Sequence, residues 1–207
     1  MTITDRKLRE KIEMRSSILE AAKELFAEDG FQNVSIRKIA DKIEYSPATI
    51  YLYFKDKDAI LFDLHNEGFR KLFEWQRDRA KIKDPVQRLS SLLQGYLSFA
   101  LKEPEYYDLM FMLFTPLPKI LKTAEWRYGR RAFRMLAKTV AECQEMGMMR
   151  GTRTEAAALG LWGAVHGVAS LLIRKRASML PEAELPDFAE EACMMFSHHL
   201  LAIPAKR

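Results

Sequence analysis

Hydroxyl and cationic side chains gather in a short stretch near the N-terminus, between Ser46 and Lys57. The pair Ser46-Pro47 predicts the start of a helix, because the serine oxygen accepts a hydrogen bond from a free backbone amide and proline at the first helical position needs no N–H. Hydroxyls and a lysine near helix starts add donors to the backbone N–H groups that point outward there, and such positions bind phosphate. The chemistry predicted for this stretch is therefore phosphate binding.

Sequence motifs for enzymatic chemistry are absent. The chain has no phosphate-cradling glycine loop, no GxSxG and no HExxH. Cys143 and Cys193 could each join a histidine as a nucleophile, but cysteines on apolar helices are usually inert core residues, and no CxxC spacing indicates a metal site. His166 has no partners at metal-ligand spacing. We therefore expect no enzyme, no metal and no cofactor, while an all-α small-molecule enzyme remains an alternative.

The elements that must position this stretch are predicted to be short helices. Apolar spacing over residues 16–28 predicts an amphipathic first helix that Gly30 ends. Ser35 is expected to cap a short second helix, a third helix runs from Ser46 to about Tyr53, and Asp56 caps a longer fourth helix. Two short helices joined by a tight turn have the dimensions of a helix-turn-helix, whose second helix fits the major groove of DNA.

The remainder of the chain also reads as helix. Prolines and glycines divide it into segments, and we find no alternating strand pattern and no Asn-Gly hairpin turn. The sequence predicts an all-α protein with three small N-terminal helices and about six longer ones. The last two helices are expected at Glu155–Arg176 and Asp187–Ile203.

The run SIRKIADKIEYSPATIYLYFKDKDAIL, residues Ser35 to Leu61, resembles the N-terminal signature of the tetracycline-repressor (TetR) family of bacterial regulators. In that signature a hydroxyl residue and an apolar residue precede Ile-Ala, a turn, a serine and an aromatic run ending Tyr-x-Tyr-Phe-Lys-x-Lys. The resemblance implies a helix-turn-helix DNA-binding domain over residues 1–58, followed by a ligand-binding and dimerisation domain over residues 59–207.

The resemblance also implies roles for single residues of the DNA-binding domain. The residues expected on the recognition helix, facing the groove, are Ser46, Pro47, Ala48, Thr49, Tyr51 and Leu52. Tyr53 and Lys57 would hold phosphates, and Ser35 and Arg37 would add contacts to the DNA backbone. Packing between helices is the alternative role for Tyr51 and Tyr53.

Three positions near the recognition helix refine this interpretation. Ile50 and Phe54 should face the core of the domain. Glu44 occupies a turn position that is commonly glycine in the family, so the turn is either strained by roughly 1 kcal/mol or different in shape. Leu52 replaces a residue that is often polar, and it either contacts thymine methyl groups or makes no contact.

The C-terminal domain is rich in methionine and aromatic residues, which suit an adaptable apolar pocket. Trp162, His166 and Gly167 resemble the Trp-x3-His-Gly pattern of one group of TetR C-terminal domains. The resemblance implies that an inducer binds in this domain and releases DNA. Candidate pocket residues, any of which could instead be core, are Trp75, Tyr96, Phe99, Tyr107, Phe111, Trp126, Phe133, Trp162 and His166.

The last two helices are expected to pair with those of a second copy as a four-helix bundle. Candidate interface residues are Gly163, Gly167, Ser170, Met195 and His199. Such a homodimer would place two recognition helices in successive major grooves, about 34 Å apart, which predicts a palindromic operator. Ala156–Ile173 is uncharged and barely long enough to cross a membrane, but it contains a histidine and three glycines, so we interpret it as an interface helix and expect no membrane partner.

The net charge of the chain does not by itself indicate that it binds DNA. The chain has a net charge of +5, yet residues 1–58 hold equal numbers of basic and acidic side chains. The excess includes a cluster that could extend a DNA contact, bind an anionic ligand or form an ordinary solvated helix face, which is the simplest reading. This cluster consists of Lys119, Lys122, Arg127, Arg130, Arg131, Arg134 and Lys138.

The sequence therefore predicts a transcriptional regulator, a repressor that a small, largely apolar effector releases from double-stranded operator DNA. An architectural DNA-binding protein without an effector is the alternative that shares the same N-terminal domain. The charged N-terminus lacks the apolar segment of a signal peptide, and the two cysteines form no disulfide framework, so we expect a cytoplasmic protein.

Overall fold

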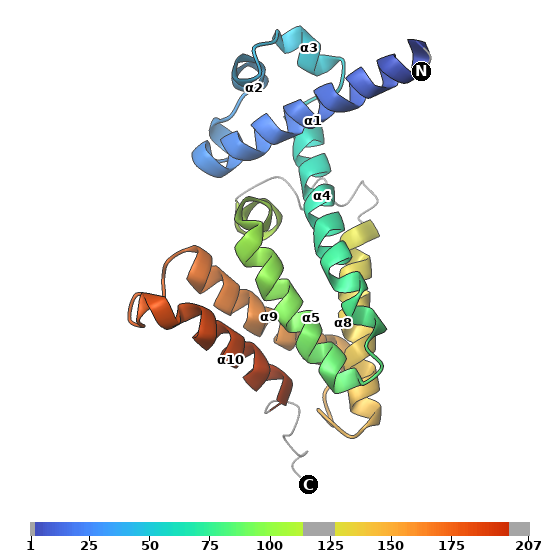
Figure 1. Cartoon of the computed structure of the whole chain (residues 1–207), viewed down its shortest axis with the longest axis vertical. Coiled ribbons are helices and arrows are strands. Elements are labelled where there is room, and N and C mark those ends of the chain that lie inside the picture. Colours follow the sequence, from blue (N-terminus) through green and yellow to red (C-terminus); the bar gives the residue numbers. More distant parts are fainter. Residues whose placement is uncertain (1–2, 114–126, 199–207) are drawn as a thin grey trace. The chain divides into compact units, whose positions relative to one another are not determined.

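The computed structural model describes residues 3–113 and 127–198, and all regular structure within these ranges is helical (Figure 1). It contains nine α-helices, which confirms the all-α prediction for the described residues. Contacts divide the chain into two compact units. The N-terminal unit comprises Met1–Gly68 and Glu105–Trp126, and the C-terminal unit comprises Phe69–Pro104 and Arg127–Arg207.

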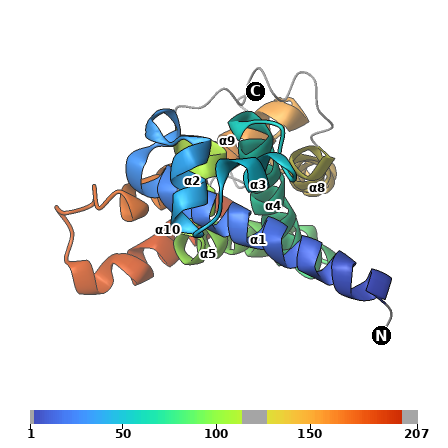
Figure 2. The ribbon, with the colours of Figure 1, turned by 90° about the horizontal axis from the view of Figure 1, so that it is seen from above.

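The N-terminal unit is built around one long helix. Its elements are α1 (Ile3–Asp29), a 3₁₀ turn (Phe31–Asn33), α2 (Ile36–Lys42), α3 (Pro47–Tyr51), the first part of α4 (Lys57–Arg77), most of α6 (Pro104–Tyr107) and a π-helical turn (Asp108–Met112). Helix α2 packs against both α1 and α3 (Figures 1 and 2). A core forms where the apolar faces of these helices meet, and the rings of Phe26 and Phe31 pack with centroids 5.1 Å apart.

Helix α1 begins at Ile3, so the expected start at residue 16 is wrong. Residues 4–13 are all exposed and bury no apolar face, so hydrophobic periodicity could not reveal them. Charged residues with good helix propensity and an exposed ion pair between Arg6 and Glu10, 3.3 Å apart, support this part of the helix. Gly30, with φ at 78°, ends the helix where the sequence predicted.

The C-terminal unit is organised around helix α5 (Pro85–Lys102). Helix α5 packs against α8 (Arg127–Glu145), α9 (Thr154–Ile173) and α10 (Leu185–His198) (Figure 1). Its side chains Leu89, Leu92 and Phe99 are fully buried or nearly so. Arg88 ties α5 to α8 by an ion pair with Glu142 and a 3.2 Å hydrogen bond to the Thr139 hydroxyl.

The ends of three helices differ from the expected bounds. Helix α3 stops at Tyr51, two residues short of the expected end. Helix α9 stops at Ile173, before the expected Arg176, because Lys175 adopts a left-handed conformation with φ at 50°. Helix α10 begins at Leu185, and the expected end at Ile203 lies outside the described residues.

Burial of His65 on α4 predicts a dependence of stability on pH. Burial lowers the pKa of His65 from 6.5 to about 4. In the unfolded chain His65 is therefore protonated below about pH 6.5, whereas in the folded protein it is protonated only below about pH 4. The free energy of unfolding is therefore highest above pH 6.5 and decreases as the pH falls toward 4. At pH 5 it should be about 2 kcal/mol lower than above pH 6.5. Urea unfolding at pH 7.5 and 5.0 measures this loss.

The variant His65→Gln should lose that part of the pH dependence. A smaller part should remain, since burial also lowers the pKa of His166. Equal losses of stability in the natural chain and in the variant would contradict the assignment to His65.

Candidate nucleic-acid interface

Side-chain caps mark the starts of helices α2, α3 and α4. The Ser35 hydroxyl accepts a hydrogen bond from the Lys38 amide at 3.1 Å, and the Ser46 hydroxyl accepts one from the Thr49 amide at 3.2 Å. The Asp56 carboxylate accepts one from the Ala59 amide at 2.7 Å at the start of α4. All three caps confirm the sequence prediction and set where α2, α3 and α4 begin.

The turn between α2 and α3 is strained at Glu44. Its φ is 60°, the left-handed conformation that favours glycine, and this costs a residue with a side chain roughly 1 kcal/mol. Hydrogen bonds from the Glu44 amide to the Asp41 carbonyl and from the Tyr45 amide to the Ala40 carbonyl, at 3.2 and 3.0 Å, hold the turn. Of the two alternatives left by the sequence, the strained turn is therefore the one found.

Helix α3 buries one face and exposes the other. Ile50 is fully buried and Phe54, just beyond the helix, is 3% exposed, as predicted. Tyr51 is 57% exposed and Leu52 is 79% exposed, and the exposed Ala48 lies on the same helix. An aromatic and an aliphatic side chain therefore stand in solvent on a helix whose other side is anchored in the core.

The other residues expected to contact DNA lie around this exposed face. Ser35, Arg37 and Ser46 are exposed, whereas Pro47, Thr49 and Tyr53 are half-buried. Tyr45, in the turn before α3, is 50% exposed and was not predicted from the sequence. An aromatic residue directly before a Ser-Pro helix start is the signal that could have found it.

Lys57 is engaged inside the N-terminal unit. Its ammonium donates hydrogen bonds to the carbonyls of Phe31 and Val34, each at 2.6 Å, and lies 4.2 Å from the centre of the Phe31 ring. Burial lowers its pKa. These contacts join the start of α4 to the segment after α1, while the neighbouring Lys55 side chain is 81% exposed.

Arg15 on α1 positions the segment after α3. It forms an ion pair with Asp63, donates a 3.2 Å hydrogen bond to the Tyr53 carbonyl and lies 4.3 Å from the centre of the Phe54 ring. Burial raises the pKa of Asp63 and outweighs the opposite effect of the Arg15 guanidinium. These contacts could not be predicted from local sequence patterns, because Tyr53 and Asp63 are 38 and 48 positions away from Arg15.

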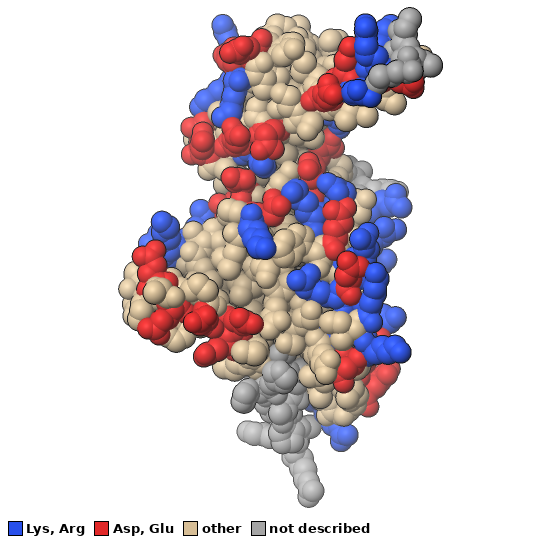
Figure 3. All heavy atoms as spheres, viewed as in Figure 1, with Lys and Arg blue, Asp and Glu red and all other residues tan. Residues whose placement is uncertain are grey.

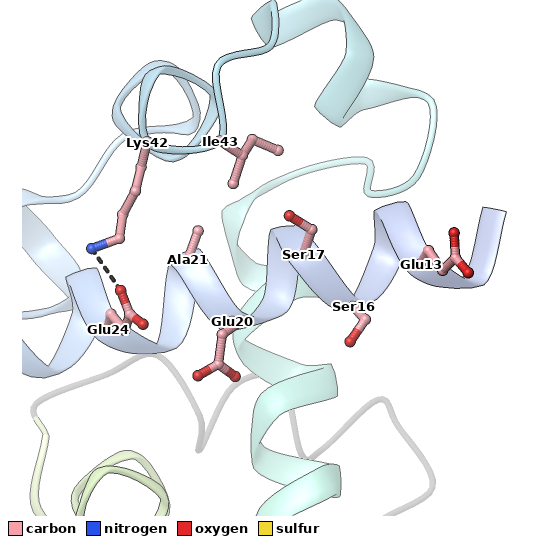
Figure 4. Close-up of a pocket in the computed structure, with 8 residues that line it drawn as sticks. All are labelled: Glu13, Ser16, Ser17, Glu20, Ala21, Glu24, Lys42 and Ile43. Carbon is pink, nitrogen blue, oxygen red and sulfur yellow. Dashed lines mark ion pairs between the residues drawn. The ribbon is translucent and has the colours of Figure 1, made fainter. Parts of the chain in front are cut away.

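A groove between α1 and α2 lies within the same unit and has acidic walls (Figure 4). Its volume is about 500 Å³, and its lining includes Glu13, Glu20 and Glu24. Lys42 reaches across to Glu24 at 2.7 Å. The carboxylates would repel phosphate, so a DNA backbone is not expected in this groove.

Three of the predicted pocket residues meet in the C-terminal unit. The Tyr96 hydroxyl on α5 lies 2.8 Å from His166 Nδ1 on α9, and the rings of Trp162 and His166 meet edge to face with centroids 5.9 Å apart. Burial lowers the pKa of His166, which favours the neutral imidazole. An aromatic cluster with one polar pair therefore spans two helices of this unit.

The remaining pocket candidates are distributed over both units. Trp75, Phe99 and Phe133 belong to the C-terminal unit, where Phe99 is fully buried. Tyr107 and Phe111 belong to the N-terminal unit, and their rings lie 5.5 Å apart. Trp126 lies outside the described residues. Within the described residues, these candidates meet in two groups, the cluster around His166 and the Tyr107–Phe111 pair.

The candidate interface residues lie mostly on exposed positions of α9 and α10. Gly163 and Gly167 are exposed, and a Cβ atom added to either would meet nothing within 4 Å. Ser170 is half-buried, and Met195 is 46% exposed. His199 lies outside the described residues.

Comparisons with known proteins match both parts of the chain. The family described as bacterial regulatory proteins, tetR family, matches residues 18–64, and the family described as tetracyclin repressor-like, C-terminal domain, matches residues 89–195. The HTH-type transcriptional regulator HbdR of Aromatoleum sp. (strain CIB) is 32% identical over 153 residues, which cover 72% of this chain and 64% of HbdR. The matched region thus spans just under two thirds of that relative.

Solved structures share the fold. The fatty acid degradation regulator FadR from Bacillus halodurans has a TM-score of 0.74 at 19% identity, covering 90% of this chain and 95% of its own. FadR from Bacillus subtilis, in complex with stearoyl-CoA, has a TM-score of 0.72 at 18% identity, covering 88% of this chain and 97% of its own. Since the C-terminal family match alone covers about half of the chain, the protein belongs to the tetR family of bacterial transcriptional regulators.

Proposed function

We propose that this regulator is a homodimeric cytoplasmic repressor that holds a palindromic operator and is released by a small, largely apolar effector. Residues 1–58 would bind DNA, and residues 59–207 would bind the effector and a second copy of the chain. The observation that carries the proposal is the exposure of Tyr51 on α3 and of Leu52 at its C-terminal end, while Ile50 on the same helix is fully buried. A short helix held by its apolar face leaves its outer face free for a major groove.

Two kinds of DNA contact follow from the geometry around α3. Tyr51 and Leu52 stand far enough from the core to reach base edges, and the Leu52 side chain suits a thymine methyl group. Tyr53 and the exposed Lys55 would contact phosphates, which orient the protein without reading sequence. We propose that Lys55 contacts a phosphate in addition to the expected Lys57, because the Lys57 ammonium already donates hydrogen bonds to two carbonyls.

An apolar face of α9 supports the proposed homodimer. Within the described residues, this helix is the one long and apolar enough to cross a membrane, and only 28% of its apolar window is buried. Leu159 and Leu171 are 56% and 50% exposed, and Gly160 and Gly163 leave open space between them. A second copy would cover this face, and its glycines would let two helices approach closely.

The proposed effector site centres on the Tyr96–His166 pair. This pair offers hydroxyl and imidazole groups within a largely aromatic cluster, which is the usual composition of a small-molecule site. Acyl thioesters are the first class to test, because the structurally similar FadR of Bacillus subtilis was solved with stearoyl-CoA.

Selection of operators from a random DNA pool tests the proposed function. We expect enrichment of a palindrome whose half-sites are about 10 base pairs apart, centre to centre. The variant Tyr51→Ala should bind this palindrome at least about fivefold more weakly, since a good contact to a base edge is worth about 1–3 kcal/mol. A matched change outside the proposed face, Gln32→Ala, should retain binding. Failure to enrich any sequence would contradict specific operator binding.

Lys55 and Lys57 should separate DNA contact from stability. The variant Lys55→Met should keep its melting temperature, bind all DNA sequences more weakly and lower the slope of log K against log salt by about one. The variant Lys57→Met should lose on the order of 2 kcal/mol of unfolding free energy, because it removes two hydrogen bonds from a charged donor. If Lys57→Met keeps the unfolding free energy of the natural chain and lowers the slope of log K against log salt, the phosphate contact belongs to Lys57, and the proposed role of Lys55 is contradicted.

Bulky side chains on α9 should break the proposed dimer. Gly163→Leu and Gly167→Leu add volume where the isolated chain has open space, so helicity should persist while the mass by light scattering falls from twice 24.0 kDa to 24.0 kDa. Glu145→Leu, at an exposed position on α8, is the control and should leave the dimer intact. A monomeric natural chain, or glycine variants that remain dimers, would contradict this interface.

A further inference from the structure

Five basic side chains form a continuous row on the exposed face of α8. This α8 basic row consists of Arg127, Arg130, Arg131, Arg134 and Lys138, and all five residues are exposed. Their spacing places them on one side of the helix, while the opposite side buries Ala132, Leu136 and Val140. Figure 3 shows Lys and Arg atoms gathered along this side of the C-terminal unit. Lys119 and Lys122, which the sequence grouped with them, lie outside the described residues.

The row repels itself. Each arginine has another cation three or four residues away, and like charges at these spacings destabilise a helix by a few tenths of a kcal/mol per pair. No acidic residue occurs between Arg127 and Lys138. The next one, Glu142, is already paired with Arg88 and lies 3.9 Å from Lys138.

Some basic side chains elsewhere in the molecule are paired with carboxylates. Lys38, Lys42 and Lys81 each pair with a carboxylate at 2.6 to 2.7 Å. Within the described part of the chain, no ion pair is found for Arg130 or Arg134. The α8 basic row is therefore a local concentration of positive charge, with Lys138 lying 3.9 Å from Glu142 at its C-terminal end.

The direction of the helix adds to this positive potential. The first turn of α8 contains Arg127 and Arg130, whereas its carboxylates, Glu142 and Glu145, lie in the last turn. A helix is stabilised by the opposite arrangement, because its N-terminus carries partial positive charge and its C-terminus partial negative charge. Helix stability thus does not account for Arg127 and Arg130, whereas an anion bound near them would be attracted by both their side chains and the helix N-terminus, whose effect is limited to the first turn.

We propose that the α8 basic row binds the phosphate-bearing head of the effector. This inference rests on the proposed function and narrows its effector to an amphiphile whose apolar part carries a polyphosphate head. Four of the five residues are arginines, whose planar guanidinium groups bind phosphate through paired hydrogen bonds. Neighbouring residues of the row are about 5–6 Å apart at Cβ, so several can converge on one compact, multiply charged anion.

Aromatic side chains lie next to the row, which a surface that binds only the DNA backbone would not require. Tyr128, next to Arg127, is half-buried and packs against Phe73 with ring centroids 6.2 Å apart. A ligand with a charged head and an apolar or ring-bearing portion can use both surfaces, whereas a DNA backbone would use the charges alone. The exposed face of α3 in the N-terminal unit already provides the surface proposed for DNA.

The test compares two triple variants of the full chain that lose the same charge. The first is Arg130→Gln, Arg131→Gln and Arg134→Gln. The control is Lys83→Gln, Arg150→Gln and Arg176→Gln, which removes exposed cations from other parts of the C-terminal unit. Calorimetric titration with inorganic tripolyphosphate at low salt measures binding of the head alone, without DNA or an acyl chain.

We expect the first variant to bind tripolyphosphate at least about tenfold more weakly than the natural chain, and the control to change less than about twofold. In operator release, stearoyl-CoA should act at lower concentration than stearate, and this advantage should disappear in the first variant. Equal tripolyphosphate affinity in both triple variants would overturn the proposal, as would equal potency of stearoyl-CoA and stearate.

Two further outcomes separate this inference from the proposed function. Weaker operator binding by the first variant, with unchanged tripolyphosphate affinity, would assign the row to DNA and overturn the proposal. If neither stearoyl-CoA nor stearate releases the operator, the proposed effector class fails, and with it the assignment of the row to an effector head. In that case, loss of tripolyphosphate binding in the first variant but not in the control would still show that the α8 basic row binds anions.

Discussion

The burial of Ile50 and Phe54 is the constraint on which the proposed DNA-binding surface depends. Helix α3 has five residues, far too few to persist in water without tertiary contacts. Its apolar side is anchored in the core of the N-terminal unit, and Arg15 holds the following segment through the Tyr53 carbonyl and the Phe54 ring. With that side engaged, Tyr51 and Leu52 have no place except solvent, so the same packing that stabilises the helix presents its outer face.

Local chemistry explains which parts of this surface could be predicted from sequence. The caps at Ser35, Ser46 and Asp56 act over three residues, so neighbouring residue types reveal them, whereas the turn at Glu44 was suggested by the family resemblance, which left its shape open. The role of Lys57 was hidden, because the carbonyls that it binds are 26 and 23 positions earlier in the chain. A lysine in a DNA-binding signature therefore has its ammonium engaged in holding the fold together.

The C-terminal unit was less predictable for the same reason. Helical spacing of aromatic residues indicates buried faces, but it does not tell which rings meet, and Tyr96 and His166 are 70 positions apart. The basic residues of α8 were visible as a cluster, yet their conflict with the helix dipole depends on where the helix begins and ends. The two units thus differ in surface chemistry: Tyr51 and Leu52 give an uncharged surface at α3, whereas α8 carries a concentrated positive surface, and we propose that the first binds DNA and the second binds the head of the effector.

Methylation protection by dimethyl sulfate on a selected operator tests the central claim most directly. The reagent attacks guanine N7, which lies in the major groove, and adenine N3, which lies in the minor groove. If α3 enters the major groove in each half of a dimer, the protein will protect guanine N7 in two patches about 10 base pairs apart. Protection confined to adenine N3, or a single patch of protected guanines, would contradict the account.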